Sequence, residues 1–192
     1  MGITNPAALA TGAGEEGVKG KDLGELVKVL EAPKRLSGLG KWKPINQKAE
    51  TGAGLEIRGV VEIGVSFRAQ CNPALPEENV SLMLFTETEA RPRCFSRIDW
   101  RGSKHDNTNK ALTGKYWGQS AGRTHFHDPR LHLHIDFKTL FATPGVDLPI
   151  ATEILPEPSS FQLLLAESAI LLRIDNLGEL PDPPWPATRS LF

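Results

Sequence analysis

Apolar residues recur along the chain at two spacings, one typical of helices and one typical of strands. Leu23, Leu26, Val27 and Leu30 lie at the spacing of one helical face, and Asp22 before them is a candidate N-cap. The same spacing returns in FQLLLAESAILL, residues 161–172, behind two serines that can cap a helix. The pattern therefore predicts one helix in the first part of the chain and one near its end.

Alternation of apolar and polar residues predicts strands between these two helices. In LEIRGVVEIGVSFRAQ, residues 55–70, the period of two indicates a half-buried strand, or a strand pair bent near Gly59. Further strands are predicted for VSLMLF (80–85), RCFSRIDW (93–100), THFHD (124–128) and RLHLHIDF (130–137). Residues 40–54 and 72–79 are interpreted as a loop and a turn. Residues 101–123, which show no clear period, are interpreted as a long loop.

The order of these elements suggests an α+β fold, an antiparallel sheet with helices packed on one face and flexible termini. One domain is the natural expectation for 192 residues. We expect a disordered tail over residues 1–20, a single α+β domain over 21–177, and a Pro-rich C-terminal tail over 178–192. Trp185 and Phe192 are candidates to dock that tail on the body or on a partner.

Composition and sequence motifs indicate the class of protein and its compartment. The chain is 40% hydrophobic and 23% charged, which is typical of soluble globular proteins. No apolar run approaches the length of a membrane span, and the N-terminus lacks a secretory pattern, so we expect a cytoplasmic protein without a membrane partner. In that compartment Cys71 and Cys94 would be reduced thiols. Phosphate-binding glycine loops, the dinucleotide fingerprint and the nucleophile elbow are all missing from the sequence.

Charge and histidine content single out one region. Residues 91–134 carry nine Lys and Arg against three Asp, whereas residues 135–192 carry three Lys and Arg against eight acidic residues. All five histidines lie between residues 105 and 134, within that basic block. Such a block attracts anions, nucleic acid among them. The alternative is a solvated basic loop balanced by the acidic C-terminal third.

Strand geometry groups the histidines with other polar residues, because residues i, i+2 and i+4 of a strand share a face. The groups are His132, His134 and Asp136; His125 and His127; and Arg97, Asp99 and Arg101. If these strands are neighbours, one sheet face presents arginine, aspartate and several imidazoles, with the loop KHDN (104–107) over its end.

Three chemistries fit this grouping. Two imidazoles can act as general acid and base, and arginines can balance a phosphate, which would allow RNA cleavage without a metal. The pair His132 and His134 can instead bind a divalent metal such as zinc, with Asp136, Asp99 or His105 completing the shell. The histidines can also merely form hydrogen bonds in a non-catalytic module that binds a protein partner.

Several segments carry a resemblance to known proteins. APKRL, EIRGVVEIGVSFRAQ, SRIDWRGSKHDN, HLHIDF and DLPIATEI resemble an uncharacterised bacterial family with an R-x-D, H-x-N, H-L-H core, itself similar to that of TumE-type toxins of toxin–antitoxin pairs. The resemblance covers about residues 24–155, and its most specific positions are Arg97, Asp99, His105, Asn107, His132 and His134. The chain departs from the toxin pattern after R-x-D, where Trp-Arg-Gly replaces Asn, and in the long stretch 108–123. The resemblance implies a toxin-like or mobile-element setting and nucleic-acid cleavage.

Together these patterns predict a toxin-like ribonuclease that needs no cofactor and has RNA, and an antitoxin-like protein, as partners. The predicted catalytic residues are His105, His132, His134 and Asp99. The predicted substrate-binding residues are Arg97, Arg101, Lys104, Asn107 and Arg123. The alternatives are a metal-binding protein, with His132, His134 and Asp136 as ligands, and the partner-binding module.

Overall fold

The computed structural model describes residues 21–142 and 148–186. Within them, one antiparallel sheet of eight strands dominates, in the order β1-β3-β4-β5-β6-β9-β10 with β2 paired to β3. Its strands are β1 (Lys34–Ser37), β2 (Lys43–Ile45), β3 (Lys48–Ile57), β4 (Val60–Cys71), β5 (Val80–Thr86), β6 (Arg93–Trp100), β9 (His125–His127) and β10 (Thr152–Glu153). A second, two-stranded sheet joins β7 (His105–Asp106) to β8 (Ser120–Gly122).

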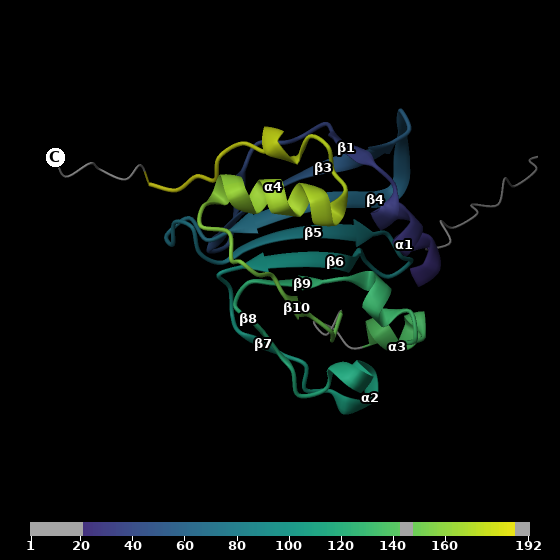
Figure 1. Cartoon of the computed structure of the whole chain (residues 1–192). Coiled ribbons are helices and arrows are strands. Elements are labelled where there is room, and N and C mark those ends of the chain that lie inside the picture. The colour runs from purple at the N-terminus through teal and green to yellow at the C-terminus, as the bar shows by residue number, and fades with distance from the viewer. Residues whose placement is uncertain (1–20, 143–147, 187–192) are drawn as a thin grey trace, which may run out of the picture.

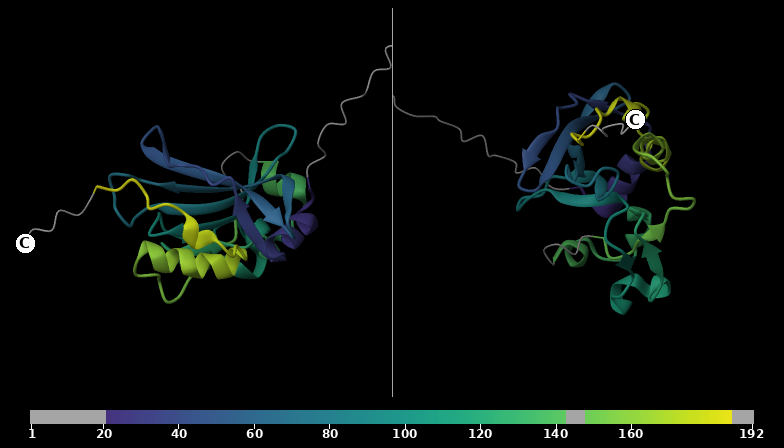
Figure 2. Two further views of the ribbon diagram at one scale, coloured as in Figure 1. Left: turned by 90° about the horizontal axis from the view of Figure 1, so that it is seen from above. Right: turned by 90° about the vertical axis from the view of Figure 1, so that its left-hand side faces the viewer.

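Helices cover the sheet and its end. They are α1 (Leu23–Glu31), α2 (Lys110–Thr113), α3 (Phe137–Ala142) and α4 (Phe161–Leu172), and 3-10 turns span Gly114–Tyr116, Pro129–His132 and Leu177–Glu179. The longest helix, α4, lies across one face of the central strands (Figure 1), and the view from above shows it as a second layer (Figure 2). Strand β8 contacts β10, and α2 lies beyond β7 and β8 at the lower end of the molecule (Figure 1). The predicted α+β class is confirmed.

The core forms between α4, α1 and the covered face of the sheet. Phe67, Leu82, Leu84, Ile98 and Trp100 are fully buried there and belong to one apolar cluster with the inward residues of both helices. Alternation along β5 and β6 places Leu82, Leu84, Ile98 and Trp100 in this core, whereas Ser81, Arg97 and Asp99 are only partly buried. The polar residues between them therefore point to the opposite face, which is where the candidate site lies.

Both predicted helices are confirmed, together with their caps. Asp22 accepts a hydrogen bond from the Glu25 backbone at 2.8 Å, and the Glu25 carboxylate accepts one from the Asp22 backbone, which makes a capping box. Ser160 caps α4 through the backbone of Leu163. The prediction of a strand pair bent near Gly59 is also confirmed, since β3 and β4 form a hairpin there and Gly59 adopts a φ of 80°.

Residues 40–54, predicted as a loop, instead form β2 and much of β3, so that prediction is wrong. Small side chains carry the alternation, with Ala49, Thr51 and Ala53 buried along β3. At Gly52, between them, the neighbouring strand is close, because a Cβ there would lie 3.0 Å from the carbonyl oxygen of Phe67. Gly, Ala and Thr are only weakly hydrophobic, so the alternation of a strand is hard to detect in the sequence of this segment.

The strand predicted over residues 130–137 does not form, and that prediction is wrong as well. The chain enters a 3-10 turn at Pro129, capped by Asp128, whose carboxylate accepts a hydrogen bond from the Arg130 backbone at 2.9 Å. Helix α3 then follows from residue 137. Residues 101–123, expected to be one long loop, contain β7, α2 and β8.

The described part of the C-terminal tail packs on the body. Trp185 donates from its indole nitrogen to the Asn72 carbonyl at 3.2 Å and meets Phe161 edge-on at 5.5 Å between ring centroids. Docking of Trp185 is thereby confirmed. The predicted disordered tail over residues 1–20 and Phe192 both lie outside the described residues. No helix in the part of the chain that the structure describes has the length and apolar character needed to cross a membrane.

A buried lysine joins the ends of the two main helices. The ammonium group of Lys34, which is 1% exposed, donates to the carbonyls of Leu30 at 2.7 Å and Leu172 at 2.6 Å, at the C-terminal ends of α1 and α4. Burial lowers the pKa of Lys34 to about 8. The cation therefore satisfies carbonyls that have no partner within their own helices.

The variant Lys34→Met should lower the free energy of unfolding by about 2–4 kcal/mol, because it leaves these buried carbonyls without donors. Urea denaturation of the two proteins measures the change. As a matched control, Lys28→Met on the exposed side of α1 should change stability by no more than about 0.5 kcal/mol. Equal stability of the Lys34 and Lys28 variants would contradict the bridging role.

Candidate functional site

The site is built on the pairing of β6 with β9. In this antiparallel register Arg97 lies opposite His127 and Asp99 lies opposite His125. The expectation that one sheet face collects an arginine, an aspartate and imidazoles is therefore confirmed for these four residues. They lie on the face opposite the core. Ile98, which stands between Arg97 and Asp99 in β6, is buried in the core, and neighbouring residues of a strand point to opposite faces.

Asp99 is the centre of the contacts on this face. Its Oδ2 lies 3.1 Å from His125 Nε2, 3.8 Å from His127 Nε2 and 2.8 Å from Arg97 Nε. Its other oxygen, Oδ1, accepts a hydrogen bond from Ser81 Oγ at 2.6 Å. Arg97 also reaches His127, with Nη2 at 2.9 Å from Nε2. The carboxylate thus contacts four side chains, from β5, β6 and β9.

His105 joins this group from β7, across the end of the sheet. Its ring centroid lies 5.3 Å from that of His125 and 4.8 Å from that of His127. Its Nε2 lies 3.3 Å from the Pro149 carbonyl, an acceptor, so Nε2 carries the proton and Nδ1 keeps the lone pair. One ring nitrogen from each of His105, His125 and His127 lies within 4.8 Å of the other two. We call these three residues the three-histidine cluster.

His125 lies between two acceptors. Its Nδ1 is 3.2 Å from the Gly122 carbonyl and its Nε2 is 3.1 Å from Asp99 Oδ2, so each ring nitrogen faces an oxygen. The turn that presents this carbonyl needs glycine. Gly122 has a φ of 67°, and a Cβ there would lie 2.6 Å from Glu153 Oε1.

Charge states in the site follow from burial and these contacts. Burial by itself would raise the pKa of Asp99, but the hydrogen bond from His125 and the Arg97 guanidinium hold it well below its usual range. Burial lowers the pKa of His105, and burial together with Arg97 lowers the pKa of His127 well below its usual value. At neutral pH the site therefore holds a carboxylate, a guanidinium, and neutral rings at His105 and His127.

A polar cleft of about 490 Å³ opens onto these groups. It is lined by Lys48, Asn72, Asn79, Ser81, Arg97, Asp99, Gly102, Ser103, Lys104, His105 and His125. Three of these residues are cationic, so the cleft suits an anion. A larger hollow of about 700 Å³ lies between α1, β1 and the β3–β4 turn, but no histidine lines it.

His132 and His134 do not join this site as predicted. His132 is fully buried and uses both ring nitrogens, since Nδ1 donates to the Asp128 carbonyl at 2.9 Å and Nε2 accepts from the Ile150 backbone at 3.0 Å. His134 is exposed and contacts the Leu112 carbonyl at 3.1 Å. His132 therefore stabilises buried backbone, whereas His134 lies at the surface, and neither belongs to the site.

The alternative metal set of His132, His134 and Asp136 is wrong in its geometry. It required a strand that puts the three side chains on one face, and the chain turns into a 3-10 helix instead. The Asp136 carboxylate accepts hydrogen bonds from the backbone and hydroxyl of Thr139, at the start of α3. Neither nitrogen of His132 has a lone pair left for a metal.

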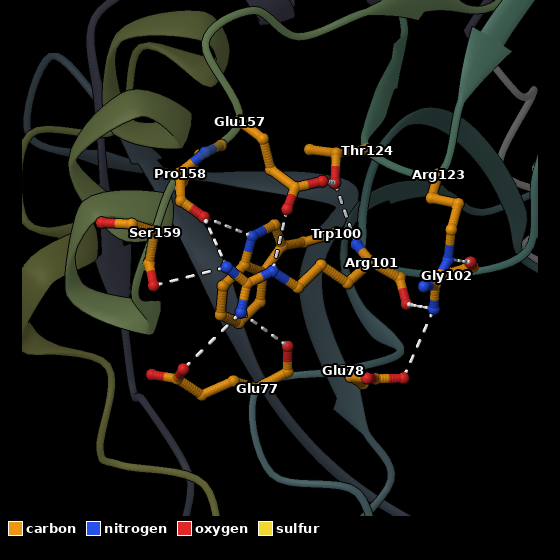
Figure 3. Close-up of polar contacts among 10 residues, drawn as sticks. All are labelled: Glu77, Glu78, Trp100, Arg101, Gly102, Arg123, Thr124, Glu157, Pro158 and Ser159. Atoms are coloured by element: carbon orange, nitrogen blue, oxygen red, sulfur yellow. Dashed lines mark hydrogen bonds and ion pairs between the residues drawn. The ribbon is translucent and has the colours of Figure 1, made fainter.

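Arg101 and Arg123, predicted to bind substrate, belong to a separate network (Figure 3). Arg101 follows the last residue of β6 with a φ of 49°, so its side chain leaves the face of Arg97 and Asp99. Its Nε donates to Glu157 at 3.0 Å, and its guanidinium lies 4.6 Å from the Trp100 ring. The arginine ties the end of β6 to the segment before α4.

Arg123 also holds the backbone that follows β6. Its Nε donates to the Gly102 carbonyl and its Nη2 to the Arg101 carbonyl, both at 2.9 Å, and Nη2 also contacts Glu78 at 3.3 Å. Figure 3 shows these bonds closing the loop after β6. The two arginines thus hold backbone that borders the cleft, and neither lines it.

Asn107, another residue predicted to bind substrate, is buried and forms hydrogen bonds with the backbone beside the site. Its side chain accepts from the Ala151 backbone at 2.9 Å and donates to the Ala151 carbonyl at 3.1 Å. With His105 on Pro149 and His132 on Ile150, three side chains hold three consecutive residues. Lys104, also predicted to bind substrate, lines the cleft and pairs with Asp106 at 3.2 Å.

His125 and His127 are the residues that the predicted site omitted. Their signal was present in the sequence, as an H-x-H pair able to share a face with Arg97 and Asp99. The HLH pair at residues 132–134 carried an equal signal, but the turn at Asp128 and Pro129 keeps it out of the sheet, and β9 pairs with β6 through the first pair.

No protein-family model matches the chain, and no curated protein or solved structure matches it.

Proposed function

We propose that the protein is a ribonuclease that cleaves RNA by acid–base chemistry in the polar cleft, with His105 as general base and His125 as general acid. The observation that carries this proposal is the placement of the two rings. They line one cationic cleft with their ring centroids 5.3 Å apart, and they have different partners, the Pro149 carbonyl for His105 and the Asp99 carboxylate for His125. His105 offers a lone pair at Nδ1, whereas His125 holds a proton at Nε2 beside Asp99.

Each step assigns a proton to a named atom. His105 Nδ1 takes the proton from a ribose 2′-hydroxyl, and the 2′-oxygen attacks the adjacent phosphorus. The bond from phosphorus to the 5′-oxygen breaks, and His125 Nε2 gives its proton to that leaving oxygen. The products are a 2′,3′-cyclic phosphate and a 5′-hydroxyl. Water and a cofactor are not required for this transfer.

Other residues of the cleft support the reaction by charge and position. Arg97, Lys48 and Lys104 line the cleft and balance the negative charge of the phosphate. Asp99 orients His125 and stabilises its protonated ring, as the 3.1 Å contact favours. His127 is a positioning residue, because it touches Arg97 and is itself fully buried.

The cleft should bind single-stranded RNA with an affinity that falls as salt increases. Each phosphate contact contributes roughly 0.7 to the slope of log affinity against log salt, so three cations predict a slope near 2. Binding is measured with His105→Ala protein, which prevents cleavage during the titration.

Adding Lys104→Gln to that protein should reduce the slope by roughly 0.7. Lys28→Gln, which removes an exposed lysine of α1 outside the cleft, should leave the slope unchanged. Affinity that is indifferent to salt, or that responds equally to both substitutions, would contradict the cleft as the RNA site.

The proposal includes the toxin-like setting that the R-x-D and H-x-N elements suggest. Arg97, Asp99 and His105 from that resemblance lie together in the cleft, which supports it. An antitoxin-like protein that blocks the cleft would be the expected partner. Cys71 and Cys94 are both buried and form no disulfide, in keeping with a proposed cytoplasmic location.

A further inference from the structure

We propose that the three-histidine cluster also binds a divalent transition-metal ion, that this ion competes with Arg97 for the site, and that its binding switches the ribonuclease off. The metal site stands on the geometry alone. The switch rests on the proposed function, and the two are tested by different readouts.

The spacing of the ring nitrogens suits one ion. Around tetrahedral zinc, with bonds of about 2.1 Å, neighbouring nitrogens lie about 3.4 Å apart. The cluster offers one nitrogen from each ring within 4.8 Å of the other two, so modest ring rotations complete a three-nitrogen site. Asp99 supplies the fourth ligand, since its Oδ2 already lies 3.1 Å from His125 Nε2 and 3.8 Å from His127 Nε2.

His127, the most buried ring of the cluster, also has a nitrogen without a hydrogen-bond partner among the described residues. His127 Nδ1 is buried and has no hydrogen-bond partner, in a side chain that is 0% exposed. With Arg97 donating to Nε2, the proton of the neutral ring must sit on Nδ1, where nothing accepts it. The arrangement with Arg97 in place therefore leaves one buried polar atom unsatisfied.

Arg97 and a metal ion exclude each other. A neutral imidazole has one lone pair, and in His127 that lone pair accepts from Arg97 at 2.9 Å. An ion bound to either nitrogen takes the lone pair, and it also brings a second positive charge beside the guanidinium. The Arg97 side chain is 32% exposed and lines the open cleft, so it has a path outward.

Metal binding removes both partners of the proposed proton transfer. The ion occupies the lone pair of His105, which then accepts no proton, and takes the place of the proton on His125. A chelator should restore the activity, in contrast to an enzyme whose reaction depends on the ion. The cluster would thus make cleavage respond to the availability of a metal such as zinc.

The test uses zinc as the probe and measures its affinity in competition with a chromophoric chelator, together with the shift in melting temperature. The wild type should bind one zinc ion. Arg97→Met should bind it at least about tenfold more tightly, because the competing cation is gone. Lys104→Met is the matched control, since it removes a cleft cation that touches none of the histidines, and its affinity should change less than about threefold. Asp99→Asn should weaken binding at least tenfold.

No zinc binding by the wild type or by Arg97→Met would overturn the metal site. Equal affinities of Arg97→Met and Lys104→Met would overturn the competition. If Arg97→Met does not fold, the zinc affinity of His127→Gln is measured instead, because its amide keeps a hydrogen bond to Arg97 and offers no ligand nitrogen. Its affinity should fall at least tenfold, and an unchanged affinity would overturn the site. Zinc binding without any ribonuclease activity in chelator rejects the switch and the proposed function but leaves the metal site standing.

Discussion

Replacing His105 by alanine is expected to reduce the rate of RNA cleavage by about 10²–10⁴-fold, the contribution typical of a general base. The ring is half-buried at the rim of the cleft and its Nδ1 is the proton acceptor of the proposed reaction. Initial rates on a mixed-sequence RNA in the presence of a chelator measure the loss. The variant should remain folded, because the ring is only half-buried and its contact with the Pro149 carbonyl, at 3.3 Å, is long.

His134→Ala is the matched control for that measurement. His134 belongs to the same histidine-rich stretch, but it is exposed and touches only the Leu112 carbonyl. Its removal should leave the cleavage rate within about twofold of the wild type. A folded His105 variant with full activity would place the active site elsewhere.

Replacing His132 by alanine is expected to lower the free energy of unfolding by about 2–4 kcal/mol. The substitution leaves the Ile150 backbone N–H and the Asp128 carbonyl without partners and opens a cavity in a fully buried position. Thermal or urea unfolding measures the change. His134→Ala again serves as the control, with an expected change below about 0.5 kcal/mol.

The same residue should make the fold sensitive to acid. Burial lowers the pKa of His132 to about 4 from an ordinary value near 6.5. Between these two values the unfolded chain binds a proton that the native protein does not, so the free energy of unfolding falls as the pH falls. The contribution of this group is about 1.4 kcal/mol per pH unit.

His132→Gln removes the titrating group from the comparison. Its free energy of unfolding should therefore change less steeply between pH 6.5 and 4 than that of the wild type. Parallel curves for the two proteins would show that His132 does not set the acid sensitivity.

The sequence predicted the fold well where large apolar residues or capping residues marked an element. Asp22 and Ser160 begin the helices predicted for them, and β6 spans the predicted residues. It predicted β3 poorly, because the buried residues Ala49 and Thr51 are small and alternate with Glu50 and with Gly52, where the backbone of β4 lies close. Such closeness depends on the neighbouring strand, which local patterns do not contain.

The candidate site was predictable as a region but not residue by residue. Both H-x-H pairs have the spacing of a strand, yet Asp128 and Pro129 start a 3-10 helix that ends at His132, so the second pair forms no strand. Arg101 continues the alternation of β6 in the sequence, but its positive φ ends the strand there. The register of β6 against β9, which depends on contacts distant in sequence, selects the first pair for the site.

The most direct measurement of the central claim is the chemistry of the cleaved ends. RNA is incubated with the wild-type protein in chelator, and the products are identified by mass spectrometry, beside an RNA whose riboses carry 2′-O-methyl groups. Proton transfer by His105 and His125 predicts 2′,3′-cyclic phosphate and 5′-hydroxyl ends on the first RNA and an intact second RNA. An uncleaved first RNA, 3′-hydroxyl ends, or cleavage of the methylated RNA would contradict the account.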